Sequence, residues 1–385
     1  METKVPRLDV VDLLRGFVIA LMVLDHTRDY FHISAYTLDP TDPARTHVWL
    51  FMTRWITHLC APTFVFLAGV SVYLQGANGK DPLQLTRFLL SRGVWLIALE
   101  LTVLAFGLNF ALPFLFLQVI WAIGASMILL AGIIWLPRPA AAIIGAVIVA
   151  GHQLLAPINP ANVGAFAPLW TLAFEFGPAF GLGFISYPAI PWFGVMCLGY
   201  ALGPVFMQEP TRRNRTLLTL ALSAITLFLV LRASNVYGDP APWKAFPEAA
   251  RTVMSFFNVS KYPPSLLFVL ITLGVSLLCL LAFQRLRGVL ARVLLAYGRT
   301  PLFTYVLHIY VVHGASLVVA VLAGYPAAYH VNFLRDPFRL YKAGFGFNLA
   351  TVYLVWLAIL VALYPAARWF AQVKRRRRDW WLSYL

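Results

Sequence analysis

Ten stretches of about 20 mostly apolar residues follow one another along this chain and leave few folds open to it. A stretch of this length crosses the hydrocarbon core of a bilayer as one α-helix. Only 12% of the residues are charged, against about 25% in a soluble domain. We therefore predict an all-α polytopic membrane protein with these spans: 9–31, 48–74, 88–108, 112–136, 139–157, 188–207, 215–234, 262–283, 301–322 and 346–370.

Lys and Arg residues lie mainly in every second connection between these spans, and in the tail "KRRRRDWW". Under the positive-inside rule this places both termini in the cytoplasm. The net charge of +15 is spread over these short clusters instead of one continuous face, so we expect no nucleic-acid partner. We expect one transmembrane domain over 1–385 with a basic cytoplasmic tail at 371–385. The aromatic, Gly-rich segment 158–187 is expected to be an external re-entrant or interfacial element.

The stretch "LMVLDHTRDYFH", residues 21–32 at the end of the first span, carries Asp25, His26, Arg28, Asp29 and His32. A charge inside a bilayer costs roughly 2.5–3.5 kcal/mol even on insertion scales. Arg15 and His26, eleven residues apart, lie on one helix face because eleven residues make about three turns. Asp12 is spaced to pair with Arg15 at the cytoplasmic end.

Other predicted spans carry polar residues at similar depth. Arg54 and His58 are four residues apart in the second span, Gln118 lies in the fourth, and His308 and His313 lie in the ninth. These groups predict a polar cavity in the middle-to-outer half of the bundle. No pair of histidines has the helical spacing of a metal site, so we expect no metal.

Two chemistries suit such a cavity. A histidine beside carboxylates is a suitable general base for acyl transfer. Histidine and aspartate inside a bundle also suit the proton relay of a proton-coupled transporter for a small polar solute. The residue types alone leave both hypotheses open.

Two segments carry a family resemblance, "RLDVVDLLRGFVIALMVLDHTRDYF" and "TRWITHLCAPTFVFLAGVS", and "GRTPLFTYVLHIYVVH" extends it towards the C-terminus. The chain resembles the bacterial branch of the heparan-α-glucosaminide N-acetyltransferase catalytic-domain family. The Arg-x10-His pattern at Arg15 and His26 is also similar to the acyltransferase-3 membrane proteins. The resemblance implies an inner-membrane enzyme, with the lipid bilayer around it and a homodimer as an option. Its expected activity is to move an acyl group, usually acetyl, from cytoplasmic acyl-CoA to an amine or hydroxyl of an extracytoplasmic sugar or glycan.

The resemblance implies that His26 is the base, with His58 and then His47 as alternatives. Asp25 or Asp29 is expected to orient it. The full set of expected catalytic residues is His26, Asp25, Asp29, His58, Arg54 and His308. The expected substrate-binding residues are Arg28, Arg15, Gln118, His313 and Lys261. Arg87, Arg92 and Arg299 are expected to bind the CoA phosphates.

Overall fold

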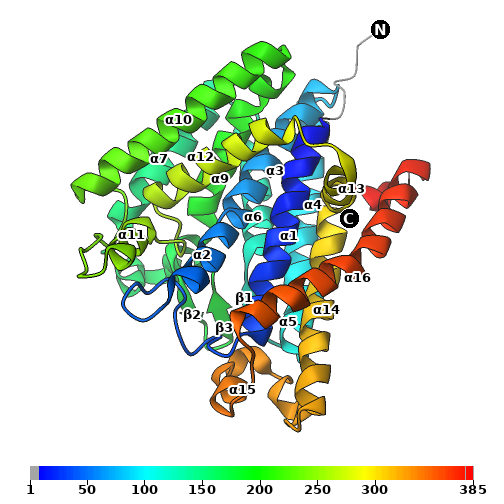
Figure 1. Cartoon of the computed structure of the whole chain (residues 1–385). Helices are drawn as coiled ribbons and strands as arrows, with labels where there is room; N and C mark the ends of the chain where they lie inside the picture. Colours follow the sequence, from blue (N-terminus) through cyan, green and yellow to red (C-terminus); the bar gives the residue numbers. More distant parts are fainter. Residues whose placement is uncertain (1–7, 378, 385) are drawn as a thin grey trace.

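Helix α1 (Asp9–Phe31) runs through the middle of the molecule, with helices from both halves of the chain around it (Figure 1). The computed structural model describes residues 8–377 and 379–384. Buried residues occur on every side of α1, as expected for a helix at the centre of a bundle. The ionisable side chains of this helix therefore have to find their partners inside the protein.

Within the described residues, eight helical stretches are long and apolar enough to cross a membrane, which confirms a polytopic helical fold. They are Val48–Ala77 (α2, Val48–Thr57, and α3, Cys60–Ala77), Pro82–Asn109 (α4, Pro82–Leu99, the π-helical η1, Glu100–Leu104, and α5, Ala105–Asn109), Arg138–Leu155 (α7, Arg138–Gly151, and η2, His152–Leu155), Ala189–Met207 (α9, Ala189–Leu202, and η4, Gly203–Met207), α10 (Pro210–Ser234), α12 (Leu266–Phe283), α14 (Pro301–Leu322) and α16 (Leu349–Arg376).

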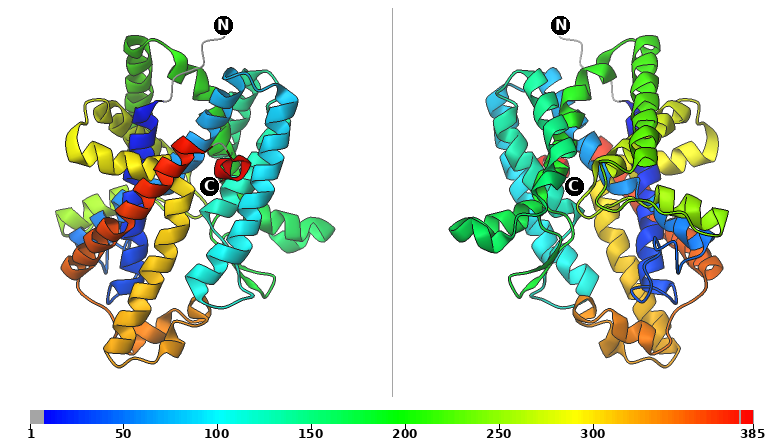
Figure 2. Two further views of the ribbon diagram at one scale, coloured as in Figure 1. Left: turned by 90° about the vertical axis from the view of Figure 1, so that its right-hand side faces the viewer. Right: turned by 90° about the vertical axis from the view of Figure 1, so that its left-hand side faces the viewer.

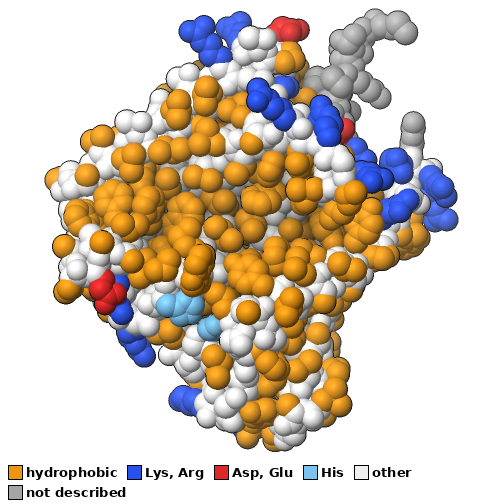
Figure 3. All heavy atoms as spheres, in the orientation of Figure 1, with side chains coloured by type: hydrophobic (Ala, Val, Ile, Leu, Met, Phe, Trp, Pro, Cys, Tyr) orange, Lys and Arg blue, Asp and Glu red, His pale blue; other side chains and the backbone are white. Residues whose placement is uncertain are grey.

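The other two predicted spans correspond to α1, which carries more charge, and to α6 (Val119–Ile133), which is shorter. A broad belt of hydrophobic side chains crosses the face shown in Figure 3. Lys and Arg side chains gather along the upper edge of this belt, at the end of the bundle where α1 begins. The exposed arginines at that end include Arg212, Arg215, Arg285, Arg287 and Arg292.

The predicted span 112–136 is longer than the helix observed there. Helix α5 ends at Asn109, and Phe110 adopts the left-handed conformation with φ 47°. Pro113 follows and has no N–H to continue a helix. Residues Leu115–Leu117 instead form strand β1, which pairs in parallel with β3 (Gly183–Ile185). Strand β2 (Gly177–Ala179) pairs antiparallel with β3 and gives the order β1-β3-β2, a small sheet that was not predicted.

The segment 158–187 is not a span, as expected. It contains a short 3-10 helix, η3 (Pro160–Phe166), the helix α8 (Ala167–Phe174), and strands β2 and β3. Eight residues of α-helix rise only about 12 Å, far less than the bilayer core. Figure 2 shows this part of the chain projecting sideways from the bundle. The remaining elements are α11 (Ala249–Phe257), α13 (Gly288–Arg299), η5 (Ala327–Tyr329), η6 (Phe333–Arg335), α15 (Phe338–Lys342) and η7 (Trp380–Ser383).

Close backbone contact fixes α1 against α13. A Cβ atom on Gly16 would lie 1.9 Å from the carbonyl oxygen of Leu294, and one on Gly298 would lie 1.7 Å from that of Asp12. Only glycine permits this approach, which is a common way for helices to pack in membranes. The contact positions the N-terminal half of α1 and therefore Arg15, one residue before Gly16.

Candidate functional site: two cavities that meet at His26

A polar cavity of about 700 Å³ lies at the C-terminal end of α1, which is the outer end by our predicted orientation. The last two turns of α1, the end of α2 and the segment that precedes α12 contribute to its walls. A polar cavity inside the bundle was predicted, and its place in the middle-to-outer half stays a prediction because it depends on the orientation. Its polar lining includes Asp25, His26, Arg28, Asp29, Arg54, His58, Gln118, Lys261 and Tyr262.

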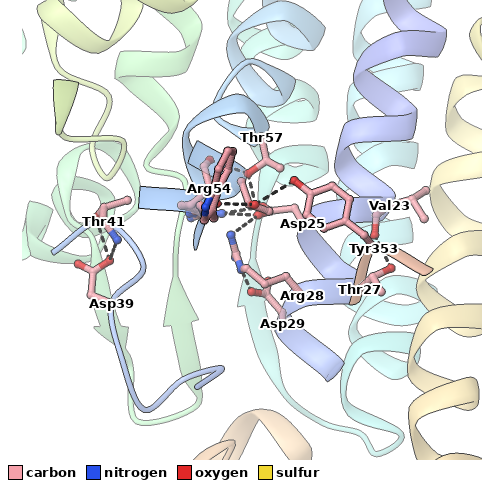
Figure 4. A network of polar contacts seen from close by, with 12 residues as sticks. Val23, Asp25, Thr27, Arg28, Asp29, Asp39, Thr41, Arg54, Thr57 and Tyr353 are labelled. Atoms are coloured by element: carbon pink, nitrogen blue, oxygen red, sulfur yellow. Dashed lines mark hydrogen bonds and ion pairs between the residues drawn. The ribbon is translucent and has the colours of Figure 1, made fainter. Parts of the chain in front are cut away.

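The charged side chains of α1 and α2 form one network, here called the Asp25 cluster: Asp25, Arg28, Asp29, Arg54 and Thr57 (Figure 4). Arg54 donates from Nη1 to both carboxylate oxygens of Asp25 at 2.7 Å, and Thr57 Oγ1 donates to the same carboxylate at 2.8 Å. Arg28 lies between Asp25, at 2.9 Å, and Asp29, at 2.6 Å. Two acids and two bases therefore neutralise one another, which explains why these charges are tolerated inside the bundle.

His26 pairs with another histidine and not with a carboxylate. Its Nδ1 lies 2.8 Å from Nε2 of His308 on α14, and the two rings are nearly parallel. Nδ1 of His308 lies 3.2 Å from the carbonyl oxygen of Thr304. Because a carbonyl only accepts, His308 carries its proton on Nδ1, and its Nε2 accepts from Nδ1–H of His26. This assignment leaves Nε2 of His26 with a free lone pair.

A second cavity, of about 620 Å³, lies at the cytoplasmic end of α1 by our orientation. It is called the inner cavity here, and the first one the outer cavity. The inner cavity has an apolar floor, to which Ile19 and Met22 contribute, and none of the described residues that line it is acidic. Its basic lining residues are Arg15, Lys80, Arg92, Arg299 and Lys374.

The two cavities approach each other around His26. Met22 lines the inner cavity and His26 the outer one, and they are one turn of α1 apart, about 6 Å along its axis. Tyr305 of α14 lies between them. Tyr305 lines the inner cavity, and its ring centroid is 6.4 Å from that of His26 and 5.3 Å from that of His308. The Tyr305 hydroxyl is buried and has no hydrogen-bond partner among the described residues.

Lys261 is buried in the wall of the outer cavity and is only 6% exposed. Its ammonium group lies over the rings of Tyr262, at 5.0 Å, and Tyr187, at 5.8 Å. Arg54 Nη2 approaches the Tyr262 hydroxyl at 3.5 Å. Burial raises the pKa of Tyr262, but Lys261 and Arg54 lower it by more, so the pKa lies below its ordinary value. Two cations therefore lie on this wall, of which Arg54 is paired with Asp25 and Lys261 is not paired with a carboxylate.

The other predicted site residues divide between the two cavities and the rest of the protein. His58 is buried, lines the outer cavity and packs edge-on against Phe268. Gln118 lines the outer cavity from the residue before α6, outside the helix in which it was expected. Arg15 lines the inner cavity and contacts Asp12 at 3.4 Å, the pairing that its spacing predicts.

Arg92 and Arg299 line the inner cavity as well, whereas Arg87 is exposed and lines neither cavity. His313 is also outside the site. Its Nδ1 lies 2.8 Å from the carbonyl oxygen of Gly107 and its ring stacks on Phe110, so it packs α14 against α5.

The sequence analysis missed three residues of the inner cavity: Tyr305, Lys80 and Lys374. Tyr305 had a usable signal, because it lies three residues before His308 on the same helix and therefore on the same side. Lys80 and Lys374 were interpreted as topology signals only. In the part of the chain that the structure describes, no group of three or more His, Cys, Asp or Glu residues is placed to hold a metal ion.

Residues 7–236 match the protein family described as heparan-alpha-glucosaminide N-acetyltransferase, catalytic. The matched range includes α1 and α2, and with them His26 and the Asp25 cluster, and it ends before α14. A comparison with curated proteins finds no match. Because the matched residues make up more than half of the chain, this protein belongs to the heparan-alpha-glucosaminide N-acetyltransferase catalytic-domain family.

Proposed function

We propose that this protein transfers an acetyl group from cytoplasmic acetyl-CoA, across the membrane, to an amine or hydroxyl of an extracytoplasmic sugar. The family implies a membrane acetyltransferase of glucosamine-type sugars that uses acetyl-CoA. One observation supports the transmembrane route above the others. His26, with its free Nε2, lies where a basic inner cavity and a polar outer cavity come within a helical turn of each other.

The inner cavity suits the donor. Acetyl-CoA carries phosphates, which basic side chains bind. A long flexible arm connects these phosphates to the thioester. The five basic residues named above supply the positive charge, and the apolar floor at Met22 receives the thioester end. The exposed arginines at this end of the bundle support its assignment to the cytoplasm. Of the three arginines expected at the phosphates, this proposal retains Arg92 and Arg299 and omits Arg87.

The chemistry follows from the two histidines and Tyr305. The acceptor's nucleophile approaches through the outer cavity and forms a bond to the thioester carbonyl carbon, while Nε2 of His26 takes its proton. The carbonyl oxygen gains negative charge, and the unpartnered Tyr305 hydroxyl is placed to donate to it. The carbon–sulfur bond then breaks, and the proton on His26 passes to the CoA sulfur. The products are the acetylated sugar and free CoA.

His308 acts as a positioning residue in this scheme. By accepting from Nδ1–H it holds the His26 ring and keeps the basic nitrogen on the side away from His308. The Asp25 cluster keeps the backbone of α1 and α2 together beside that ring. Asp25 and Asp29, which were expected to orient His26, bind arginines instead.

The variant His26→Asn tests the proposal, since an amide can still donate to His308 but cannot take a proton. His152→Asn is the control, because His152 is a histidine at the end of a helical stretch that lines neither cavity; it is buried, whereas His26 is half-buried. We expect His26→Asn to lower the rate of acetyl-CoA consumption with a glucosamine acceptor by roughly 10²–10⁴-fold, as for loss of a general base. His152→Asn should retain most of the activity.

Two results would contradict the proposal. Full activity in His26→Asn would exclude this residue as the base and direct attention to His58. No consumption of acetyl-CoA with any amino sugar, together with uptake of solute by proteoliposomes in its absence, would instead favour the transporter hypothesis.

A further inference from the structure

Lys261 is a buried cation whose close partners are tyrosines and not carboxylates. It is only 6% exposed, and no carboxylate of the described residues lies within ion-pair distance of its ammonium group. Burying a charge without an opposite charge beside it is costly, and proteins rarely keep such a group without a use for it. The ammonium group borders the outer cavity, so a ligand in that cavity can reach it.

The acids that line the outer cavity are already engaged. Two of them, Asp25 and Asp29, belong to the Asp25 cluster, which is neutral overall. Asp39 accepts from the backbone N–H and the hydroxyl of Thr41, both at 2.8 Å. Asp239 accepts from the N–H of Ser260 at 2.8 Å and faces Arg232 at 3.9 Å. Lys261 is thus the lining cation that no acid of this cavity neutralises.

Neighbouring groups hold the ammonium in place without neutralising it. The faces of two tyrosine rings attract a cation but carry no net charge. Arg54, whose charge Asp25 neutralises, approaches the hydroxyl of one of these rings, Tyr262, and offers N–H donors on the same wall. The arrangement presents positive charge and a phenol hydroxyl to whatever occupies the cavity.

We propose that Lys261, with Arg54 and Tyr262, forms a subsite for an anionic group of the acceptor, which is therefore an acidic sugar carrying a carboxylate, phosphate or sulfate. The inference rests on the proposed function for the identity of the outer cavity as the acceptor site. The anionic group binds at the Lys261 wall, and the nucleophile of the same sugar points to His26, which lines the same cavity. The subsite gives the enzyme its preference between sugars and takes no part in proton transfer.

Binding of matched sugars tests the subsite without requiring catalysis. The full-length protein is placed in nanodiscs of zwitterionic lipid, which excludes anionic headgroups as the ligand. Its thermal stability is then measured with glucosamine, glucosamine 6-phosphate, glucosamine 6-sulfate and glucuronic acid, since a ligand that binds the folded state raises the unfolding midpoint. We expect at least one acidic sugar to bind roughly 10- to 100-fold more tightly than glucosamine, the range for a hydrogen bond to a charged group.

Three variants test whether Lys261 causes the preference for acidic over neutral sugars. Lys261→Gln should abolish it, Lys261→Arg should retain it, and Lys244→Gln should leave it unchanged, because Lys244 is an exposed lysine of the same connection that does not line the cavity. Equal binding of acidic and neutral sugars by the wild type overturns the proposal, even if Lys261→Gln fails to fold. Unchanged acid preference in a folded Lys261→Gln overturns it as well.

Measuring acetyl transfer to acidic and neutral sugars separates a failure of the anionic subsite from a failure of the proposed function. Transfer to acidic and neutral sugars with the same kcat/KM, unaffected by Lys261→Gln, would reject the anionic subsite and leave the acetyltransferase intact. Lys261-dependent binding of acidic sugars without any transfer would support the subsite and reject the proposed reaction.

Discussion

Asp25 is the carboxylate that forms an ion pair with Arg54 in the described structure, so Asp25→Asn is the most informative change to the polar network. The three side chains involved, Asp25, Arg28 and Arg54, are 12%, 6% and 13% exposed. Removing one partner of a buried ion pair costs about 3–5 kcal/mol. Arg28 keeps Asp29, and the asparagine oxygen can still accept one hydrogen bond, so we expect a loss near the lower limit, about 3 kcal/mol.

The free energy of unfolding in mixed micelles measures this loss, with Asp39→Asn as the matched control. Asp39 is an exposed acid of the same cavity whose side chain accepts hydrogen bonds from Thr41, and its replacement should cost no more than about 0.5 kcal/mol. Combining Asp25→Asn with Arg54→Gln removes both charges, so the double variant should be less destabilised than the sum of the single ones by about 2 kcal/mol. Strict additivity, or a loss below 1 kcal/mol in Asp25→Asn, would refute the pairing argued here.

Three further changes probe the cavities and the packing around them. Tyr305→Phe removes a hydrogen-bond donor and keeps the ring. It should lower kcat by roughly 10²-fold with little change in the KM for acetyl-CoA. An unchanged kcat would show that the hydroxyl takes no part in the reaction. Arg92→Gln should raise the KM for acetyl-CoA roughly tenfold, whereas Arg87→Gln should leave it unchanged because Arg87 lies outside the inner cavity. Equal effects of the two variants on this KM would count against the inner cavity as the acetyl-CoA site. Gly199→Val should prevent stable folding, because a Cβ there would lie 2.0 Å from the carbonyl oxygen of Phe66 on α3; a melting temperature like that of the wild type would contradict the close α3–α9 contact.

The helical fold could be predicted because apolar length decides which segments cross a membrane. The predicted segments at α10, α12 and α14 each coincide with one long helix. The short sheet was missed, since strands of three residues carry no readable alternation and depend on contacts between Leu115 and Gly183, far apart in the sequence.

Contacts of the candidate site within one helix could be predicted from the sequence, and contacts between helices could not. The spacing of Asp12 and Arg15 predicts their pairing, and the charges at the end of α1 predict a polar cavity. Nothing in the local pattern indicates that His308 would lie against His26, because the two helices are separated by most of the chain. The sequence therefore suggested a carboxylate as the partner of His26, and the fold supplies an imidazole.

Sidedness is the most direct test of two cavities that meet at one histidine. Purified protein is sealed into liposomes, radiolabelled acetyl-CoA is added outside, and an amino sugar that cannot cross the membrane is enclosed inside. In molecules with their basic end outward, the inner cavity opens to the donor and the outer cavity to the acceptor. We predict that label accumulates on the enclosed sugar, and that His26→Asn abolishes this. Label transfer that occurs only when donor and acceptor share the same side would contradict the transmembrane route.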